Sequence, residues 1–494
     1  MNSLYERLLP YLEKRMALRT ALALLEWDME TLAPEGGMER TSHAVGVLHD
    51  TYRVATLEPE VEQIITALLS SGDLTREQRA IAEKVKEDIE DLKRIPADEY
   101  RAYAELQASA ASIWAKARSG NDFSLFAPTL KKMVGYARKF AGYKAKEGQA
   151  LYDALLEEYE KGFSMKELDR FFAILKEEIR PLLEGAAKRT DQVDDHFLYG
   201  HFTVEKQREF SGFLLDYLGF DKSRGVLAES AHPFTTHLHK DDVRLTTHYD
   251  PGNVTSAIFS TIHECGHALY EQGVADEISQ TPVGQGASCG MHESQSRFYE
   301  NFLGRSEAFW KPIFSRLAEL FPEQLGIVEL PRFIQAINQA RPGLIRIESD
   351  ELTYCLHIMV RYELEKELIG GTIEVEALPE KWAGLYEEYL GIHPRSDAEG
   401  VLQDIHWALG SFGYFPSYAL GNAFAAQLAH KLAEDYDLEE LLASGNLSVI
   451  TNWMREKIHR FGSSRTTREL LRDATGEDFD PKYYVEYLKA KFGR

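Results

Sequence analysis

The chain has 494 residues, with 79 acidic and 56 basic side chains and a formal net charge of −23 at neutral pH. This charge argues against nucleic acid and against an anionic membrane as partners, because both repel an acidic protein. The chain has three cysteines, which are too few for a disulfide framework. We interpret Cys265, Cys289 and Cys355 as small apolar residues in a reducing compartment, and a metal ligand or redox switch is the alternative for the first two.

The first residues lead directly into an amphipathic helix, without the apolar core of a secretory signal. No apolar run approaches the ~18–20 residues that a membrane-spanning helix needs. We therefore expect a cytoplasmic protein.

Helical spacing of apolar residues dominates the first part of the chain. Leu8 and Leu12 belong to one stripe of a helix that we expect over residues 3–30. A run of proline and glycine over residues 33–37 ends this helix. Further helices are expected at residues 75–94, 97–118, 124–145 and 165–186. These stripes indicate core packing rather than chemistry, so we predict an N-terminal helical wall over residues 1–190.

The pattern changes near residue 190. Residues 194–200 and 242–249 alternate and contain β-branched or aromatic side chains, which predicts two short strands of a small sheet. Helical patterns return at residues 308–321, 331–340, 348–369, 375–390, 418–436, 447–461 and 466–474. We find no convincing linker or internal repeat. The sequence therefore predicts one mainly α-helical domain over residues 1–494, with residues 191–494 as its catalytic half.

The helix expected over Val254–Gln272 carries the sequence His-Glu-Cys-Gly-His, from His263 to His267. The two histidines are one turn apart, so their rings lie on one face and can bind one zinc ion at ~2.0–2.1 Å each. Glu264 flanks that position, where a carboxylate can take a proton from a water that the metal activates. This motif also arises by chance in long chains, but a chance copy would rarely lie within a helix and precede an acidic helix at useful spacing.

A catalytic zinc site uses three protein ligands and keeps one position for water. We assign the third ligand to Glu293, in a helix expected over residues 290–303. The stretch from Val274 to Cys289, rich in glycine, serine and glutamine, allows an antiparallel return of this helix towards the first. His263, His267 and Glu293 would then form the two-histidine, one-glutamate set of thermolysin-like enzymes.

Two polar residues later in the chain each have two interpretations. Arg346 is suited to hold a carboxylate through two hydrogen bonds, or it forms an ion pair with Glu348 or Asp350 at a helix start. His406 can donate to an oxyanion, or it is a core histidine beside Trp407. The residues alone leave both questions open, although a core histidine is the commoner case.

Further candidates lie in the aromatic stretch after residue 412 and in the expected sheet. Tyr414 and Tyr418 either direct a hydroxyl at the scissile oxygen or pack as aromatic side chains. Arg244 belongs to a strand in which an ion pair with Asp242 at the sheet edge is the structural interpretation. His232 precedes a proline, which indicates an extended turn. For Arg244 and His232 the residues alone favour the structural interpretations.

Six ordered motifs across the catalytic half resemble those of the carboxypeptidase Taq family of zinc metallocarboxypeptidases, and residues 24–29 resemble the family's N-terminus. The motifs are His232-Pro233-Phe234, Asp242-x-Arg244-x-Thr246, His263-Glu264-x-x-His267, His292-Glu293-Ser294-Gln295, Ile345-Arg346-x-x-Ser349-Asp350 and Gly400-x-x-Gln403-Asp404-x-His406-Trp407. The resemblance covers essentially the full length. It implies a zincin-like, two-walled helical body with a long substrate groove and a small β-sheet beside the HExxH helix.

The resemblance also implies an activity: broad-specificity release of single amino acids from peptide C-termini, with zinc or in some members cobalt, by a homodimer. On this basis His406 becomes a catalytic donor, together with Tyr418 or Tyr414. Arg346 becomes the residue that binds the terminal carboxylate. The motifs assign His232, Arg244 and Asp350 to substrate binding as well.

Two other classes of function compete with this interpretation. The first is an oligopeptidase or a peptidyl-dipeptidase of the same superfamily, which would release internal fragments or dipeptides. The second is a helical scaffold with a structural zinc. Structural zinc sites are normally closed by four protein ligands, whereas we identify three, and Glu264 would have no purpose there.

Overall fold

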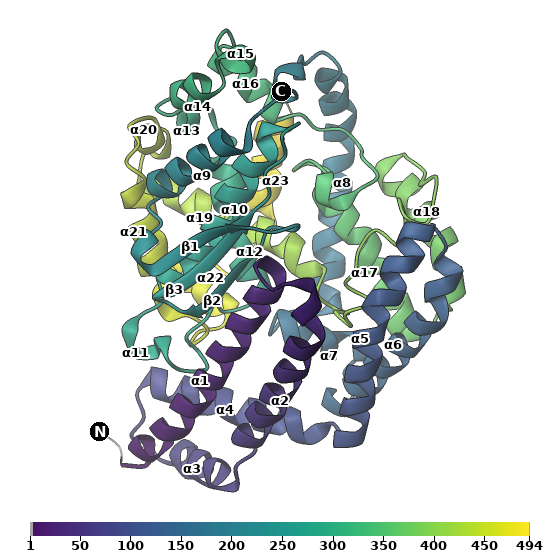
Figure 1. The fold of residues 1–494 in the computed structure, drawn as a ribbon, viewed down its shortest axis with the longest axis vertical. Coiled ribbons are helices and arrows are strands. Elements are labelled where there is room, and N and C mark those ends of the chain that lie inside the picture. The colour runs from purple at the N-terminus through teal and green to yellow at the C-terminus, as the bar shows by residue number, and fades with distance from the viewer. Residues whose placement is uncertain (1–2, 494) are drawn as a thin grey trace. The chain divides into compact units, whose positions relative to one another are not determined.

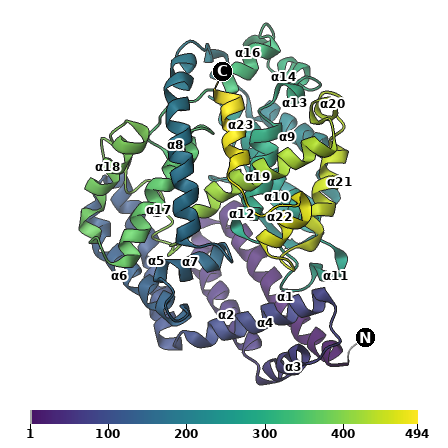
Figure 2. The ribbon, with the colours of Figure 1, turned by 180° about the vertical axis from the view of Figure 1, so that it is seen from behind.

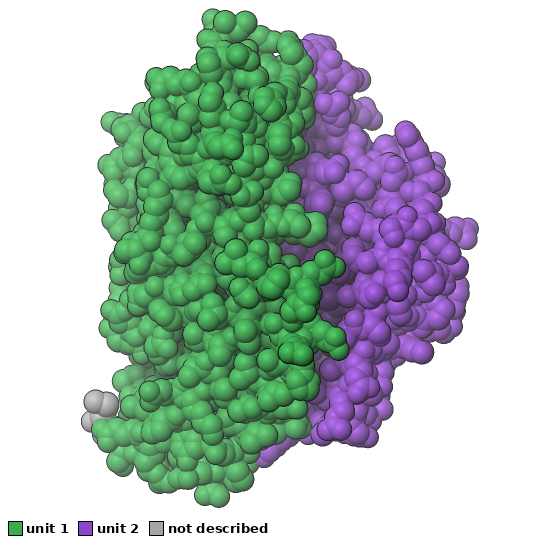
Figure 3. All heavy atoms as spheres, in the orientation of Figure 1, with its two compact units in different colours: residues 1–92, 194–337, 425–479 green, residues 93–193, 338–424, 480–494 purple. Residues whose placement is uncertain are grey.

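The computed structural model describes residues 3–493 and divides the chain into two compact units, coloured separately in Figure 3. Unit 1 comprises residues 1–92, 194–337 and 425–479, and unit 2 comprises residues 93–193, 338–424 and 480–494. Each unit is therefore assembled from three separate segments of the chain. The expected helical wall of residues 1–190 contributes to both units, and the single domain over residues 1–494 stays a prediction.

Unit 1 begins with four helices near the N-terminus. They are α1 (Ser3–Thr31), α2 (Met38–Thr56), α3 (Pro59–Ser70) and α4 (Arg76–Arg94). The predicted stripe on the first helix is confirmed, because Leu8 and Leu12 are fully buried in a cluster with Leu68 of α3 and Val85 of α4. Removing such leucine side chains from water stabilises the fold by roughly 1.5–3 kcal/mol each. The sequence analysis did not identify α2 and α3.

A three-stranded sheet precedes the central helix of unit 1. Its strands are β1 (Gly225–Glu229), β2 (Thr235–His239) and β3 (Asp242–Thr247), in the order β1-β3-β2. The middle strand pairs parallel with β1 and antiparallel with β2. The prediction of a strand at residues 242–249 is confirmed over residues 242–247. The buried residues Val243 and Leu245 lie on β3, which packs against α10 (Val254–Gln272) (Figure 1).

The strand predicted at residues 194–200 is wrong. This segment contains a short 3₁₀ turn, η2 (His196–Leu198), because the Asp194 carboxylate accepts a hydrogen bond from the His196 backbone N–H at 3.3 Å. An aspartate that binds the backbone two residues on favours a turn over an extended strand. The sheet is instead completed by β1 and β2, which the sequence analysis missed.

Unit 1 contains many further helices besides the last part of α19 (Pro416–Asp435). They are α9 (Val204–Leu218), η3 (Lys222–Arg224), α11 (Asp276–Ser279), α12 (Cys289–Arg297), the π-helical η4 (Phe298–Leu303), α13 (Glu307–Trp310), α14 (Phe314–Leu320), α15 (Pro322–Leu325), α16 (Leu330–Ile337), α20 (Leu438–Ala443), α21 (Leu447–Lys457), η7 (His459–Phe461) and α22 (Thr467–Thr475), with the short η1 (Glu35–Gly37) earlier in the chain. Among them, α9, α12 and η4 pack against α10. The helix predicted at 308–321 is two helices, because Pro312 has no N–H to donate to a continuous helix.

Unit 2 is built from long helices. They are α5 (Ala97–Gly120), α6 (Phe123–Lys144), α7 (Leu151–Tyr159), α8 (Met165–Thr190), η5 (Arg346–Glu348), α17 (Tyr354–Gly370), η6 (Val375–Ala377), α18 (Leu378–Leu390), the first part of α19 (Pro416–Asp435) and α23 (Lys482–Phe492). The last of these helices packs along α8 (Figure 2). The helices predicted over 97–118, 124–145 and 165–186 are confirmed with small shifts at their ends.

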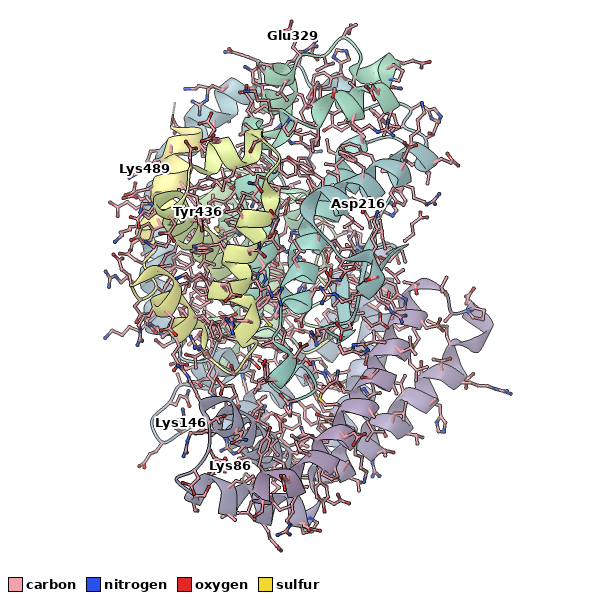
Figure 4. All side chains as sticks on the ribbon, turned by 90° about the vertical axis from the view of Figure 1, so that its left-hand side faces the viewer. Lys86, Lys146, Asp216, Glu329, Tyr436 and Lys489 are labelled. Atoms are coloured by element: carbon pink, nitrogen blue, oxygen red, sulfur yellow. The ribbon has the colours of Figure 1, made fainter. Side chains whose placement is uncertain are left out.

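Charged side chains such as Lys86, Asp216 and Glu329 are exposed on the helices and loops (Figure 4). Across residues 3–493, none of the helices combines the length and apolarity needed to cross a bilayer.

Candidate active site

The helix α10 carries the predicted metal-binding histidines. It begins after Asn253, whose side-chain oxygen accepts the Thr255 N–H at 3.0 Å, and it ends at Gln272, as the sequence predicts. The His263 and His267 rings lie one turn apart with centroids 5.0 Å apart. Burial, reinforced by nearby positive groups, lowers the pKa of His267 well below its usual value. His267 is therefore neutral, which is the form that binds a metal ion.

Glu293 reaches this histidine pair from α12. Its Oε2 atom lies 3.8 Å from His263 Nε2 and 3.7 Å from His267 Nε2, and the three donor atoms all lie within 4.8 Å of one another. Metal–ligand bonds of 2.0–2.2 Å at tetrahedral angles would place donor atoms about 3.3–3.5 Å apart. The two distances from Glu293 are a few tenths of an ångström wider than this, and the two histidine nitrogens lie within 4.8 Å of each other. The three residues are therefore placed to hold a single divalent cation after small adjustments of their side chains.

A glycine between the two histidines allows α12 to come this close. A Cβ atom on Gly266 would lie 2.6 Å from the Gln295 carbonyl oxygen and 2.7 Å from Ser296 Cα. These distances are far inside van der Waals contact, so any larger residue would push α12 away from α10. The close crossing of the two helices therefore positions Glu293 opposite the histidines.

Glu264 lies beside the metal-binding group and is nearly buried, with 6% of its surface exposed. The Thr235 hydroxyl, on β2, donates a hydrogen bond to Glu264 Oε2 at 2.7 Å. Burial raises the pKa of the Glu264 carboxyl above its usual value, while His263 and the Thr235 hydrogen bond act in the opposite direction. A carboxylate that is held in one orientation and has a raised pKa is suited to accept and return a proton.

A second layer of charge fixes His263 and Glu293. The Nδ1 atom of His263 lies 2.8 Å from Glu300 Oε2, and Arg297 donates to Glu293 Oε1 at 2.6 Å and to Glu300 Oε2 at 3.3 Å. Burial alone would raise the pKa of Glu300, but Arg297 and His263 hold it far below its usual value. The ionised Glu300 therefore keeps the His263 proton on Nδ1 and directs Nε2 towards Glu293.

Sequence reasoning missed these supporting residues, although one of them carried a signal. Glu300 lies on the predicted helix at residues 290–303, two turns after Glu293, which is the spacing of residues on one helix face. The helix widens into the π-helical η4 at Phe298, and Glu300 on η4 contacts both His263 and Arg297. Thr235 carried no signal, because its contact with Glu264 depends on the fold of the sheet.

Arg346 lies in unit 2 and is almost fully buried. Its Nε and Nη2 atoms donate to Asp404 Oδ1 at 3.0 and 2.7 Å, and its Nη1 donates to the Tyr354 hydroxyl at 3.1 Å. Arg361 donates from Nε to the other oxygen of Asp404 at 2.7 Å. Burial alone would raise the pKa of Asp404, but the two arginines hold it far below its usual value. The ion pair of Arg346 is therefore with Asp404, not with Glu348 or Asp350.

His406 and the two predicted tyrosines lie together in unit 2. His406 Nε2 is 3.3 Å from the Tyr418 hydroxyl, and the rings of Tyr414 and Tyr418 meet edge to face with centroids 5.1 Å apart. The His406 ring also packs on Phe415, with centroids 4.5 Å apart. Burial lowers the pKa of His406 to about 4, although Asp404 acts in the opposite direction. His406 is therefore a neutral imidazole at physiological pH.

The other predicted substrate-binding residues make local contacts. Asp350 accepts the N–H groups of Leu352 and Thr353 at 2.9 and 3.0 Å, so it forms a turn before α17 and the helix predicted from residue 348 begins at Tyr354. Arg244 binds both oxygens of Asp242 at 2.8 Å. His232 is exposed in the turn between β1 and β2. The structural interpretations of Arg244 and His232 are therefore confirmed, whereas Asp350 does not form the ion pair with Arg346 that was its structural alternative. The roles of the three residues in substrate binding stay predictions.

The predicted site residues therefore fall into two local groups. The metal-binding set and Glu264 lie in unit 1, together with Arg244 and His232. Unit 2 contains the others, namely Arg346, Asp350, His406, Tyr414 and Tyr418.

Comparisons with known proteins give a consistent result. The family model of the carboxypeptidase Taq (M32) metallopeptidases matches residues 7–492. Carboxypeptidase 1 of Bacillus subtilis (strain 168) is 43% identical over 474 residues, covering 96% of this chain and 94% of that protein. Thermostable carboxypeptidase 1 of Thermus thermophilus is 38% identical over 500 residues, covering 99% and 98%. The crystal structure of an M32 carboxypeptidase from Deinococcus radiodurans R1 is similar with a TM-score of 0.96 and 35% identity, covering 100% of this chain and 99% of that chain.

Proposed function

The chain belongs to the carboxypeptidase Taq (M32) family and is a metallocarboxypeptidase that acts on peptides, and on this premise we propose that its metal is zinc held by His263, His267 and Glu293. The observation that carries the proposal is the convergence of two imidazole nitrogens and one carboxylate oxygen within 4.8 Å. Two histidines and one glutamate are the ligand set of thermolysin-like catalytic zinc sites. A structural site would normally take a fourth protein ligand.

Zinc bound here would polarise the scissile carbonyl and make a water more acidic. Glu264 then accepts the proton of the attacking water and passes it to the leaving amine. The hydrogen bond from Thr235 at 2.7 Å supports this role, because it restricts the carboxylate to one orientation. The raised pKa of Glu264 supports it as well, because a group that must both take and return a proton works best with a pKa near the working pH.

For the groups in unit 2 we propose the roles that the family resemblance implies. His406, with Tyr418 or Tyr414, donates to the oxyanion that develops on the substrate. The neutral imidazole and the 3.3 Å contact between His406 Nε2 and the Tyr418 hydroxyl support a pair of neutral donors. Asp350, His232 and Arg244 contribute to substrate binding, and their local contacts give no independent support for it.

Arg346 is proposed to bind the terminal carboxylate of the peptide, so that one amino acid leaves in each cycle. Its guanidinium is held in place by Asp404 through two hydrogen bonds, which supports a preorganised anion-binding group. Its Nη1 atom already donates to Tyr354 at 3.1 Å. A substrate carboxylate bound by Arg346 therefore has to share or replace that hydroxyl.

The test is a digestion of one peptide with a free C-terminus, followed by mass spectrometry. We expect a ladder of products that each lose one C-terminal residue, with activity lost on treatment with a chelator and restored by Zn²⁺. Released dipeptides or internal fragments would contradict the proposed single-residue mode. Restoration by another divalent cation but not by Zn²⁺ would contradict the proposed metal.

Further features follow from the resemblance alone and stay predictions. They are the ability of Co²⁺ to replace zinc, a homodimeric assembly, broad specificity for the C-terminal residue and a cytoplasmic location. Size-exclusion chromatography with light scattering tests the dimer, and a set of peptides that differ only in their last residue tests the specificity.

A further inference from the structure

A second histidine lies directly behind the proposed ligand His267. The Nδ1 atoms of His267 and His292 are 2.6 Å apart, and His292 Nε2 lies 2.8 Å from Glu271 Oε1. Glu271 is one turn after His267 on α10, and His292 immediately precedes Glu293 on α12. The three side chains therefore form a continuous hydrogen-bonded chain that ends at the imidazole of a proposed ligand.

The positions of the protons along this chain follow from its two ends. His267 directs Nε2 towards Glu293 Oε2, at 3.7 Å, so a metal bound there takes the lone pair of Nε2 and the ring proton lies on Nδ1. This Nδ1–H donates to His292 Nδ1, which requires His292 to carry its own proton on Nε2. That Nε2–H donates to the Glu271 carboxylate. With the metal bound, this is the arrangement in which both imidazoles are neutral and every ring proton has an acceptor.

The surrounding fold holds the far end of the chain in place. The Glu271 side chain is 3% exposed, and its Oε1 also accepts the Gly286 backbone N–H at 3.1 Å. A Cβ atom on Gly286 would lie 2.5 Å from His292 Cδ2, so the loop before α12 passes directly against the imidazole. The Tyr270 ring also packs against His292, with centroids 5.4 Å apart. These contacts leave the His292 ring little freedom to rotate.

The two proposed histidine ligands are therefore supported in different ways. His263 contacts a carboxylate directly, with Nδ1 at 2.8 Å from Glu300 Oε2. The Nδ1 atom of His267 instead contacts the imidazole of His292, which connects it to the Glu271 carboxylate. Groups that hydrogen-bond a ligating histidine fix its tautomer and its orientation, and their loss typically weakens metal binding 10–100-fold.

We propose that His292 is a positioning residue of the metal site, which holds His267 in the Nδ1–H tautomer and connects it to Glu271. The inference rests on the proposed metal site and goes beyond it, because it assigns a role to a residue that binds neither metal nor substrate. It predicts that metal affinity depends on a hydrogen-bond acceptor at the position of His292 Nδ1.

The test compares the Zn²⁺ affinity of full-length variants, measured by competition with a chromophoric chelator. His292→Phe keeps a planar ring and removes both hydrogen bonds, and we expect a 10–100-fold loss of Zn²⁺ affinity. His292→Asn returns an oxygen near the position of Nδ1 and should recover most of that loss. Tyr270→Phe is the matched control, because it removes the hydroxyl that accepts the Ala287 N–H at 3.1 Å and leaves the chain from His267 to Glu271 intact.

A second readout separates positioning from a general loss of fold. Thermal unfolding of the metal-free proteins should give one cooperative transition for His292→Phe and for His292→Asn, as for the unsubstituted chain. Zn²⁺ binding by His292→Phe within twofold of the unsubstituted chain would overturn the inference. An equal loss of affinity in Tyr270→Phe, or no recovery in a folded His292→Asn, would overturn it too. Failure of the unsubstituted chain to bind Zn²⁺ would instead overturn the proposed zinc site itself, and the inference with it.

Discussion

Replacement of Glu264 by glutamine tests the proposed general base without disturbing its surroundings. The amide has almost the same size, and its oxygen can still accept the hydrogen bond that Thr235 now donates at 2.7 Å. Glu264 is 6% exposed, and within residues 3–493 its side chain forms no ion pair with an arginine or lysine. A neutral replacement should therefore not destabilise the fold. Loss of a general base typically lowers kcat by about 10²–10⁴, which corresponds to about 3–5 kcal/mol in the activation barrier.

The assay is the rate of C-terminal residue release from a saturating peptide, together with the zinc content of the same samples. We expect kcat to fall by about 10²–10⁴ while the zinc content stays at that of the unsubstituted enzyme. Glu351→Gln is the control for the loss of a buried carboxylate outside the metal site: Glu351 lies in unit 2 and binds Lys491 at 2.6 Å, so its replacement should lower stability but leave kcat unchanged. A Glu264→Gln enzyme with a kcat within tenfold of the original would refute the assignment of the base. So would a loss of activity that only follows a loss of zinc.

Three further predictions concern the helix crossing, the substrate carboxylate and a buried acid. Gly266→Ala places a Cβ atom 2.6 Å from the Gln295 carbonyl, so we expect about 1–3 kcal/mol of destabilisation in urea unfolding and weaker zinc binding; Gly384→Ala, whose Cβ meets nothing within 4 Å, should do neither. Arg346→Ala should slow cleavage of free-acid peptides far more than that of C-terminally amidated ones, and an equal loss on both would make Arg346 only a partner of Asp404. Burial raises the pKa of Glu365 to about 7, although Gly413, Trp407 and Tyr152 donate hydrogen bonds to it. The folded state holds the Glu365 proton more tightly than the unfolded state does, so protonation of Glu365 adds to the free energy of unfolding. This contribution is on the order of 3 kcal/mol; it is complete below the unfolded pKa and is lost as the pH rises through 7. Urea unfolding of the unsubstituted chain and of Glu365→Gln, each at pH 5 and pH 8, measures this contribution. If the two proteins differ in free energy of unfolding by the same amount at both pH values, the raised pKa is contradicted.

The sequence predicted the parts of the site that depend on spacing within one helix. His263 and His267 lie on one face because four residues make about one helical turn. The approach of Glu293 could be anticipated as well, because a loop of the right length joins two helices. The sequence did not predict that Gly266 controls this approach, since the contact is made by the backbone of a second helix.

Apart from Glu300, the groups that reach the site from another element could not be predicted from the sequence. Thr235 reaches Glu264 from a strand that the sequence analysis did not identify. The partner of Arg346 is Asp404, 58 residues away, rather than the acidic neighbours that spacing suggested. The contact of His292 with His267 depends on how the two helices cross, so its sequence position beside Glu293 indicated only a motif.

Anomalous diffraction at the zinc absorption edge, from crystals of the full-length enzyme prepared with Zn²⁺, tests the central claim most directly. We expect one strong peak per chain, about 2.0–2.2 Å from His263 Nε2, His267 Nε2 and Glu293 Oε2, with water in the remaining position. A peak bound by other side chains, or by a fourth protein donor in place of water, would contradict the proposed catalytic zinc site.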